Sequence, residues 1–480
     1  MSGHNQQIKL KQTLHGYQIF FIVLSAVIGT GVFSNNGAAM AIAGPWGLLL
    51  SILIMSLIAI AVSESIGELT QEFPVSNAIV TYVGAFVDPD FGWVIGLAYW
   101  YAYAASFAVQ NAAVAELATY WELSRTWQIL AFYFLAPVLF FWLNMTGVFY
   151  YGIVETVGGV LKLCFIFGVS IYFYVLSGQE QLGGSDGSIS DGFQNKPPMF
   201  LTHAQAVCYA IPLVAYSFQG IELVSMTAFE ARDDRALRWP ARWTVYVVVL
   251  VYIMCTVGEV LTVKWTNDHL SPIPGAPQVN PRTIDERPPA SNSVPVIAAW
   301  NAGHTKLAGF INGCLILSGL SAANTSLYAS SRTLYGIVSS LPGFVRGGRS
   351  QMNFESMQPF PAWLGLIGCI LIFCFSSATW WVSKVTFDKV ATAYAAHVVL
   401  FILLIMLKLA NGTLFKRWGV PLSPDKTELS QTLRGLSNDM LAEQPSDGLV
   451  ALTISESSRR TVSLERRESA EGRDNGVLSE

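Results

Sequence analysis

Long apolar stretches alternate with short polar segments along most of the chain. A transmembrane helix needs about 20 apolar residues, and on this rule the pattern predicts about ten spans. The eighth is too long for one straight crossing, so we expect it to extend into the cytoplasm. The predicted spans cover residues 16–39, 46–66, 92–121, 128–147, 154–176, 203–228, 243–263, 305–338, 362–380 and 388–409.

Polar segments flank the apolar part of the chain. Residues 1–15 form a polar N-terminal arm, residues 16–410 hold the predicted spans, and residues 411–480 are polar and mixed in charge. A mixed-charge segment with few aromatic residues is typical of a disordered tail. Basic residues mark cytoplasmic loops, and here they concentrate before span 1, after span 6 and after span 8. We therefore expect the arm, these loops and the tail to be cytoplasmic.

The composition excludes most soluble classes. Hydrophobic residues make up 52% of the chain and charged residues 12%, whereas soluble domains carry about 25% charged residues. We therefore expect a multi-pass protein of the lipid bilayer and not a soluble enzyme. The net charge of −4 gives no indication of a nucleic acid partner. All six cysteines lie in apolar segments without metal-ligand spacing, so neither a metal site nor a cofactor is predicted.

The first span contains an unusual run, Ile28-Gly29-Thr30-Gly31. Glycine is a poor helix former, and a backbone N–H freed inside hydrocarbon needs a partner other than water. A bound anion is one such partner, because the N-terminus of a half-helix presents N–H groups to a carboxylate. The alternative is that Gly29 and Gly31 only allow a neighbouring helix to approach closely.

The sixth span contains a second unusual run, Tyr216–Glu222, which follows Pro212. About ten spans divide into two equal halves, and an odd number of spans in each half inverts the second half in the membrane. Both halves would then begin with an interrupted helix. Paired interruptions indicate a substrate site at the midplane, and they disfavour the packing explanation, which must account for each break separately.

Two ionisable residues lie well inside predicted spans, Lys162 and Glu222. Each requires a buried partner or a water cavity, and such residues often belong to ion pathways. The alternative for Lys162 is that its ammonium group reaches the membrane surface. Glu116 and Glu259 lie near the outer ends of their spans, and we predict that both are interface residues.

Two polar or aromatic clusters have no single interpretation. The aromatic set in span 3, which includes Tyr99 and Tyr103, is consistent with either a pocket lining or an interfacial belt. Asn324 makes one face of span 8 polar, which fits either a substrate path or hydrogen bonding between helices.

These motifs together resemble those of amino acid permeases in the amino acid–polyamine–organocation superfamily, and most closely the fungal-type permeases. The resemblance covers about residues 10–400. It is carried by Gly29–Phe33, Ala43-Gly44-Pro45, Gly67-Glu68 with Pro74, Tyr151-Gly152 with Glu155 and Lys162, Ser217–Glu222 (Ser-Phe-Gln-Gly-Ile-Glu), Glu230-Ala231-Arg232, and Asn324–Arg332.

The resemblance implies an all-α membrane protein with the inverted five-plus-five repeat of the leucine-transporter type, in which helices 1 and 6 are discontinuous. It also implies that the substrate carboxylate binds backbone near Gly29–Gly31 and that the amine binds carbonyl groups near Ser217–Gly220, beside an aromatic gate at Tyr216. The residues expected at the substrate site are Ile28, Gly29, Thr30, Gly31, Tyr103, Tyr216, Ser217, Phe218, Gly220 and Asn324.

Glu222 and Lys162 match positions that are linked to proton coupling in relatives, and a lysine at that position disfavours sodium coupling. Two departures from the family pattern stand out. The family usually has twelve spans, and the last two are missing here or replaced by the polar tail. Gln110 stands where many relatives carry a glutamate in the third span, which disfavours a cationic substrate.

The sequence therefore predicts a transporter and not an enzyme. We expect a plasma-membrane protein that imports an amino acid with protons by alternating access, with the amino acid, the proton and the bilayer as its partners. The alternatives are a sensor that binds an amino acid without transporting it, and an inactive truncated homologue.

Overall fold

The structure is a computed structural model in which the described part of the chain is almost entirely helical. Leu14 and Ala231 form an isolated β-bridge, and no strand is present among the described residues. The described residues are 13–178 except 74 and 76, 189–195, 200, 202–232, 234–267, 269–270, 293–339, 367 and 387–412.

Six helical stretches of the described chain are long and apolar enough to cross a membrane. This confirms the predicted multi-pass membrane protein. The predicted ninth span, residues 362–380, lies outside the described residues apart from position 367, as do most of the arm and the tail. The six stretches are Gly16–Gln71, Arg125–Met145, Val148–Ser177, His203–Thr227, Ala236–Thr262 and Thr305–Ile337.

The first two spans form a chain of three helical segments. Helix α1 (Gly16–Val27) is separated from α2 (Gly31–Glu72) by a short break, and α2 itself bends at Gly44. Gly44 has φ +73°, and a Cβ atom there would lie 2.7 Å from the Gln194 Cβ, so a glycine is required. Pro45 then begins the second segment. The first N–H groups of a helix have no acceptor within the helix, so proline, which lacks an N–H, is tolerated there.

The rest of the first half consists of one oblique helix and a lipid-facing pair. The short helix α3 (Ala78–Phe86), which the sequence pattern did not predict, precedes α4 (Pro89–Leu117). The fourth span joins α5 (Arg125–Gln128), a π-helical stretch η2 (Ile129–Leu135) and α6 (Ala136–Met145), and α7 (Val148–Ser177) follows. Large apolar side chains such as Trp142 (67% exposed) cover the outer face of this pair, as expected for contact with lipid.

The second half begins with the other interrupted helix. Helix α8 (His203–Ala215) leads into a 3₁₀ turn, η6 (Tyr216–Phe218), and the helix resumes only at α9 (Leu223–Thr227) and η7 (Ala228–Glu230). Helix α10 (Asp234–Thr262) follows, and a short helix α11 (Val294–Asn301), also not predicted, precedes α12 (Thr305–Ser339). The 35 residues of α12 confirm the unusually long eighth span.

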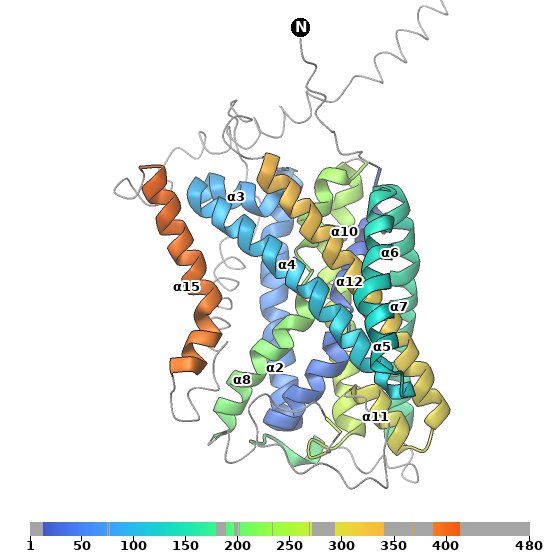
Figure 1. Ribbon diagram of the computed structural model, residues 1–480. Coiled ribbons are helices and arrows are strands. Elements are labelled where there is room, and N and C mark those ends of the chain that lie inside the picture. The colour runs from blue at the N-terminus through green and yellow to red at the C-terminus, as the bar shows by residue number, and fades with distance from the viewer. Residues whose placement is uncertain are drawn as a thin grey trace, which may run out of the picture.

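The two interrupted helices lie at the centre of the bundle. Helix α2 packs extensively on α8 and α10, while α1 packs on α7 and α10. Helix α4 runs obliquely across α12, and α5–α7 stand at the opposite edge from α15 (Phe387–Ala410) (Figure 1). The breaks of the first and sixth helices are therefore surrounded by α4, α10 and α12.

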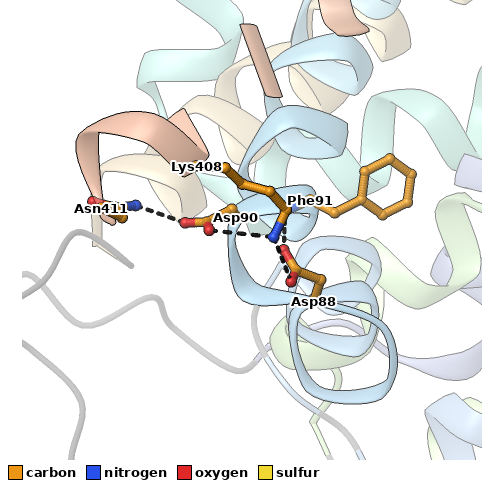
Figure 2. A network of polar contacts seen from close by, with 5 residues as sticks. All are labelled: Asp88, Asp90, Phe91, Lys408 and Asn411. Atoms are coloured by element: carbon orange, nitrogen blue, oxygen red, sulfur yellow. Dashed lines mark hydrogen bonds and ion pairs between the residues drawn. The ribbon is translucent and has the colours of Figure 1, made fainter. Parts of the chain in front are cut away.

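Helix α15 is attached to the start of α4 by a buried lysine. The Lys408 Nζ lies 2.8 Å from Asp88 Oδ2 and 3.6 Å from Asp90 Oδ2, and Asn411 donates to Asp90 (Figure 2). Asp88 is also the N-cap of α4, where its carboxylate accepts from the Phe91 N–H. Burial raises the pKa of Asp88, but Lys408 and the Phe91 N–H outweigh burial and hold the pKa below its ordinary value.

Candidate functional site

The first break exposes the N-terminus of a half-helix. Helix α1 ends at Val27, and the first bond within α2 runs from Ser34 N to Thr30 O at 3.1 Å. The N–H groups of Gly31 to Phe33 therefore have no acceptor within the helix. The predicted interruption at Ile28–Gly31 is confirmed, and its positive dipole end points into the bundle.

The second break packs directly against the first. Gly220 has φ +110°, and a Cβ atom there would lie 2.8 Å from the Ala26 Cβ. Only glycine combines this backbone conformation with so close an approach. A Cβ atom on Gly31 would likewise lie 3.1 Å from Ser217 Oγ. The predicted interruption of the sixth helix is thus confirmed, and both breaks meet at one place.

A tyrosine from α10 joins the two breaks. The Tyr252 hydroxyl lies 2.8 Å from the carbonyl oxygen of Val27 and 2.9 Å from that of Ser217. Each carbonyl belongs to a helix end in the buried interior, and the Val27 oxygen also accepts from the Gly29 N–H at 2.9 Å. Tyr252 is fully buried, and its ring packs edge-on against Phe218. The sequence analysis did not identify this residue.

A small cavity lies between the breaks. Gly29, Gly31, Tyr103, Tyr216 and Ser217 were predicted at the site and line the cavity. None of the lining side chains carries a formal charge. The remaining lining residues, which were not among the predicted set, are Ala26, Val27, Ser106, Gln110, Gln219 and Ser326.

The cavity wall is polar on one side. Ser217 Oγ is buried and has no hydrogen-bond partner among the described residues. Gln110 of α4 accepts a hydrogen bond from Thr30 Oγ1 at 3.2 Å. Ser106 Oγ lies 3.5 Å from Gln219 Oε1, so this contact is weak. Unsatisfied polar groups in a buried cavity are suited to a small polar ligand.

Glu222 lies beside the cavity and is held by two tyrosines. Tyr99 Oη donates to Glu222 Oε1 at 3.0 Å, and Tyr103 Oη donates to the same oxygen. The other oxygen, Oε2, accepts from the Gly220 N–H at 3.1 Å. Glu222 therefore connects the second break to α4. The predicted pocket role of Tyr103 is consistent with this position, because the ring also lines the cavity.

Lys162 occupies a different position, behind α1. Its Nζ donates to the Ser25 carbonyl oxygen at 2.6 Å. The Ser25 and Ser321 hydroxyl oxygens are 2.8 Å apart, and Ser321 donates to Glu155 at 2.8 Å. Lys162 and Glu155 are both buried. A polar network thus joins α1, α7 and α12 close to the first break.

Several predicted residues lie at the breaks without lining the cavity. Asn324 donates to Glu155 at 2.6 Å and accepts from Asn144 at 2.9 Å, so its side chain belongs to the Lys162 network. The Ile28 carbonyl oxygen accepts from Ser318 at 3.1 Å. Phe218 packs on Tyr252. Thr30 donates a hydrogen bond to Gln110, and the Gly220 N–H donates to Glu222.

Residues 13–15, which we call the strap, connect the segment before α1 to the segment after the second break. The Thr13 and Leu14 N–H groups donate to the Glu230 carbonyl oxygen at 3.1 and 3.0 Å, and Arg232 N donates to Leu14 O at 2.9 Å. The Glu230 carboxylate pairs with Arg332 Nε at 2.7 Å and accepts from Tyr328. Burial raises the pKa of the Glu230 carboxyl, and Arg332 opposes this effect.

Glu259 is the clearest error of the sequence analysis. It was predicted at the membrane interface, but the structure buries it completely. Its carboxylate accepts from Asn36 of α2, a helix that packs extensively on α10. Glu116, in contrast, is exposed as predicted.

Comparison with known proteins identifies related sequences. Residues 18–340 match the family model described as amino acid permease. The general amino-acid permease GAP2 of Candida albicans is 29% identical over 69% of this chain and 54% of its own length. The lysine-specific permease LysP of Escherichia coli is 27% identical over 68% of this chain and 64% of its own length. The chain thus spans about half to two thirds of such relatives.

Solved structures show a more distant likeness. A Na+-coupled sialic acid symporter in a substrate-bound, outward-open state has a TM-score of 0.45 and 10% identity, covering 84% of this chain and 78% of that chain.

Proposed function

The chain belongs to the amino acid permease family, and from this premise we propose that it is a secondary active transporter that imports an amino acid with protons by alternating access. The plasma membrane is the proposed location. The observation that supports this function best is the cavity between the two interrupted helices, which is lined by Gly31 and Ser217. Paired helix breaks at a central cavity are a common way to bind a small solute in a membrane.

We propose that the two ends of the amino acid bind to different breaks. The carboxylate would accept from the free N–H groups at the start of α2, where the helix dipole favours a negative charge. The amine would donate to oxygens on the second break. The Ser217 carbonyl oxygen already accepts from Tyr252, so the Ser217 hydroxyl and the Gln219 side chain, both on the cavity, are the better acceptors.

The proposed substrate is a neutral amino acid. No charged side chain lines the cavity, so a cationic side chain buried there would lack a counter-charge on the cavity wall. The nearby Glu222 is bonded to two tyrosines and to the Gly220 N–H. Gln110, which replaces the glutamate of many relatives, bonds to Thr30 on the same wall. The small cavity between Tyr103 and Tyr216 further favours a small side chain.

Glu222 and Lys162 are the proposed proton-coupling residues. Glu222 is bonded to a cavity-lining tyrosine and to the backbone of the second break. Lys162 is bonded to the last turn of α1. A change of charge at either residue would therefore alter a contact made by a broken helix, which is what coupling requires.

Alternating access would require the cytoplasmic strap to open. The strap holds the segment before α1 against the segment after the second break through backbone hydrogen bonds. These contacts lie outside the cavity. Their release would let the cavity open to the cytoplasm while the site itself keeps its lining residues.

Uptake into proteoliposomes tests this function. The purified full chain would be reconstituted with an inward proton gradient, and uptake of one labelled neutral amino acid would be competed with each of the twenty amino acids. We expect saturable, gradient-driven uptake that small neutral amino acids inhibit. Thermal stabilisation by an amino acid without any uptake would support the sensor, and neither stabilisation nor uptake would support an inactive homologue.

A further inference from the structure

Another buried carboxyl group lies in the outer half of the bundle, away from Glu222 and Lys162. Glu259 of α10 is fully buried, and its Oε2 accepts from Asn36 Nδ2 at 2.8 Å. Asn36, also fully buried, stands in the first segment of α2, the half-helix that begins at Gly31. The same amide donates to Thr256 Oγ1 at 3.0 Å. The pair therefore joins the outer half of the first interrupted helix to α10.

This cluster has more acceptors than donors. Asn36 Oδ1 is buried and has no hydrogen-bond partner among the described residues. Glu259 Oε1 has only the Cys255 thiol, at a sulfur–oxygen distance of 3.9 Å. A thiol is a weak donor. Buried acceptors without donors are unfavourable, and a proton on Glu259 would supply the missing donor.

No cation of the described chain neutralises Glu259. Among the helices packed on α10, neither α9 nor α11 contains a titratable side chain, and α1 contains only Tyr17, in its first turn. The segment of α2 that carries Asn36 has no titratable group before Gly44. The ammonium of Lys162 in α7 is bonded to Ser25. The next cation after α10, Lys264, is exposed.

The same face of α10 contacts the substrate site. Tyr252 and Glu259 are seven positions apart and so lie on one side of the helix, roughly 10 Å apart along its axis. Tyr252 donates to the carbonyl oxygens at both breaks. Helix α10 therefore holds the first interrupted helix at two points, the end of α1 through Tyr252 and the first segment of α2 through Glu259.

We propose that Glu259 is a proton-binding site in the outer half of the protein, and that its proton occupancy controls how firmly the first segment of α2 is held against α10. The ionised carboxylate accepts from Asn36 but remains an uncompensated buried charge, whereas the protonated carboxyl can also donate. Proton binding itself stands apart from the proposed transport function, and only its consequence for uptake rests on that function.

Infrared spectroscopy of the reconstituted full chain tests proton binding directly. A protonated carboxyl has a C=O stretching band that shifts in heavy water. We expect Glu259→Gln to lose one carboxyl equivalent of this band at neutral pH. The matched control Glu116→Gln, which changes an exposed carboxylate on the same side, should lose none. An unchanged band in Glu259→Gln, or loss of a carboxylate band instead, would overturn the proposal.

A second variant guards against a folding defect in Glu259→Gln. Asn36→Leu removes the amide that stabilises the ionised carboxylate, so the band should persist to more alkaline pH than in the parent chain. A band that depends on sodium in place of pH would also contradict a proton site.

Uptake separates this inference from the proposed function. We expect uptake by the parent chain to fall at alkaline pH as Glu259 loses its proton. The Glu259→Gln variant keeps a donor at all pH values, so its uptake should fall less. If Glu259→Gln loses the carboxyl band but the parent chain shows no uptake, the proton site is supported and the transport function is rejected. If the parent chain shows normal uptake but the band is the same in both proteins, transport is supported and the proton site is rejected.

Discussion

The Tyr252 hydroxyl lies 2.8 Å from the Val27 carbonyl oxygen, at the point where the first helix breaks. The same hydroxyl lies 2.9 Å from the Ser217 carbonyl oxygen in the sixth helix. One hydroxyl group therefore donates to two helix ends that are distant in sequence. Tyr252 therefore fixes the two interruptions relative to each other. The cavity depends on this spacing, since Gly31 and Ser217 face each other across it.

We expect Tyr252→Phe to destabilise the protein and to weaken amino acid binding. It removes a donor from two buried carbonyl groups. The Val27 oxygen keeps the Gly29 N–H, whereas a buried carbonyl left without a donor costs about 1–3 kcal/mol. The melting temperature in detergent and the ligand-induced shift would measure both effects. The control is Tyr246→Phe, whose hydroxyl bonds to Glu64 on the exposed side of the same helix. Equal effects of the two changes would contradict a special role for Tyr252.

Gly31→Ala should reduce amino acid affinity at least about tenfold, which corresponds to about 1.4 kcal/mol. The added methyl group would lie 3.1 Å from Ser217 Oγ and 3.2 Å from Tyr216 Cδ1, and would enter the cavity. Competition for labelled substrate gives the affinity. Gly168→Ala is the matched control, because a Cβ atom there has no neighbour within 4 Å. Unchanged affinity in Gly31→Ala would place the substrate elsewhere.

Glu222→Gln should abolish accumulation driven by a proton gradient but preserve exchange of amino acid across the membrane. Glutamine can still accept from Tyr103, although its NH2 group cannot accept from the Gly220 N–H, and it cannot gain or lose the proton. Counterflow and gradient-driven uptake, measured on the same vesicles, separate the two activities. The exposed Glu122 provides a control as Glu122→Gln. Full gradient-driven uptake in Glu222→Gln would refute the coupling assignment.

The attachment of α15 should depend on pH through Asp88. A carboxyl whose pKa is lowered in the folded state contributes its full stabilisation above its ordinary value of 3.8, and this contribution disappears as the pH falls through the lower folded value. Asp88→Asn keeps an N-cap residue but removes the negative charge that pairs with Lys408. We therefore expect the free energy of unfolding at neutral pH to fall by up to about 3 kcal/mol, and the melting temperature to fall with it.

Two measurements check the role of Asp88. The melting temperatures of the parent chain and Asp88→Asn should converge as the pH is lowered below the ordinary value for aspartate. The exposed Asp191, changed to asparagine, should show no difference at any pH. A constant difference across the whole pH range would mean that the ion pair with Lys408 is not its cause.

The sequence predicted both breaks because their residues are anomalous inside apolar spans. Gly29, Gly31 and Gly220 oppose a helix wherever they occur in a span, and no tertiary information is needed to see this. Gly44 and Pro45 fall between the predicted first and second spans, whereas the structure places them at a bend inside α2. The short helices α3 and α11 have nine and eight residues, too few for the length of about 20 by which the spans were predicted.

Partners across the bundle could not be predicted. Tyr252 resembles any other aromatic residue of an apolar span until α10 is placed beside both breaks. Glu259 lies near the end of its helix, where side chains usually reach water, but its carboxylate turns to Asn36 of α2. Asn324 was expected at the cavity, whereas its amide turns to Glu155. In each case the partner of the side chain depends on how its helix is rotated about its own axis. A single sequence does not determine this rotation.

In the proposed transport cycle, opening of the strap at residues 13–15 is a step that every substrate shares. Its hydrogen bonds to Glu230 O and from Arg232 N do not touch the cavity, so the energy needed to break them is the same whatever side chain the cavity holds. Amino acids that differ widely in affinity should therefore leave into the cytoplasm with a common limiting turnover.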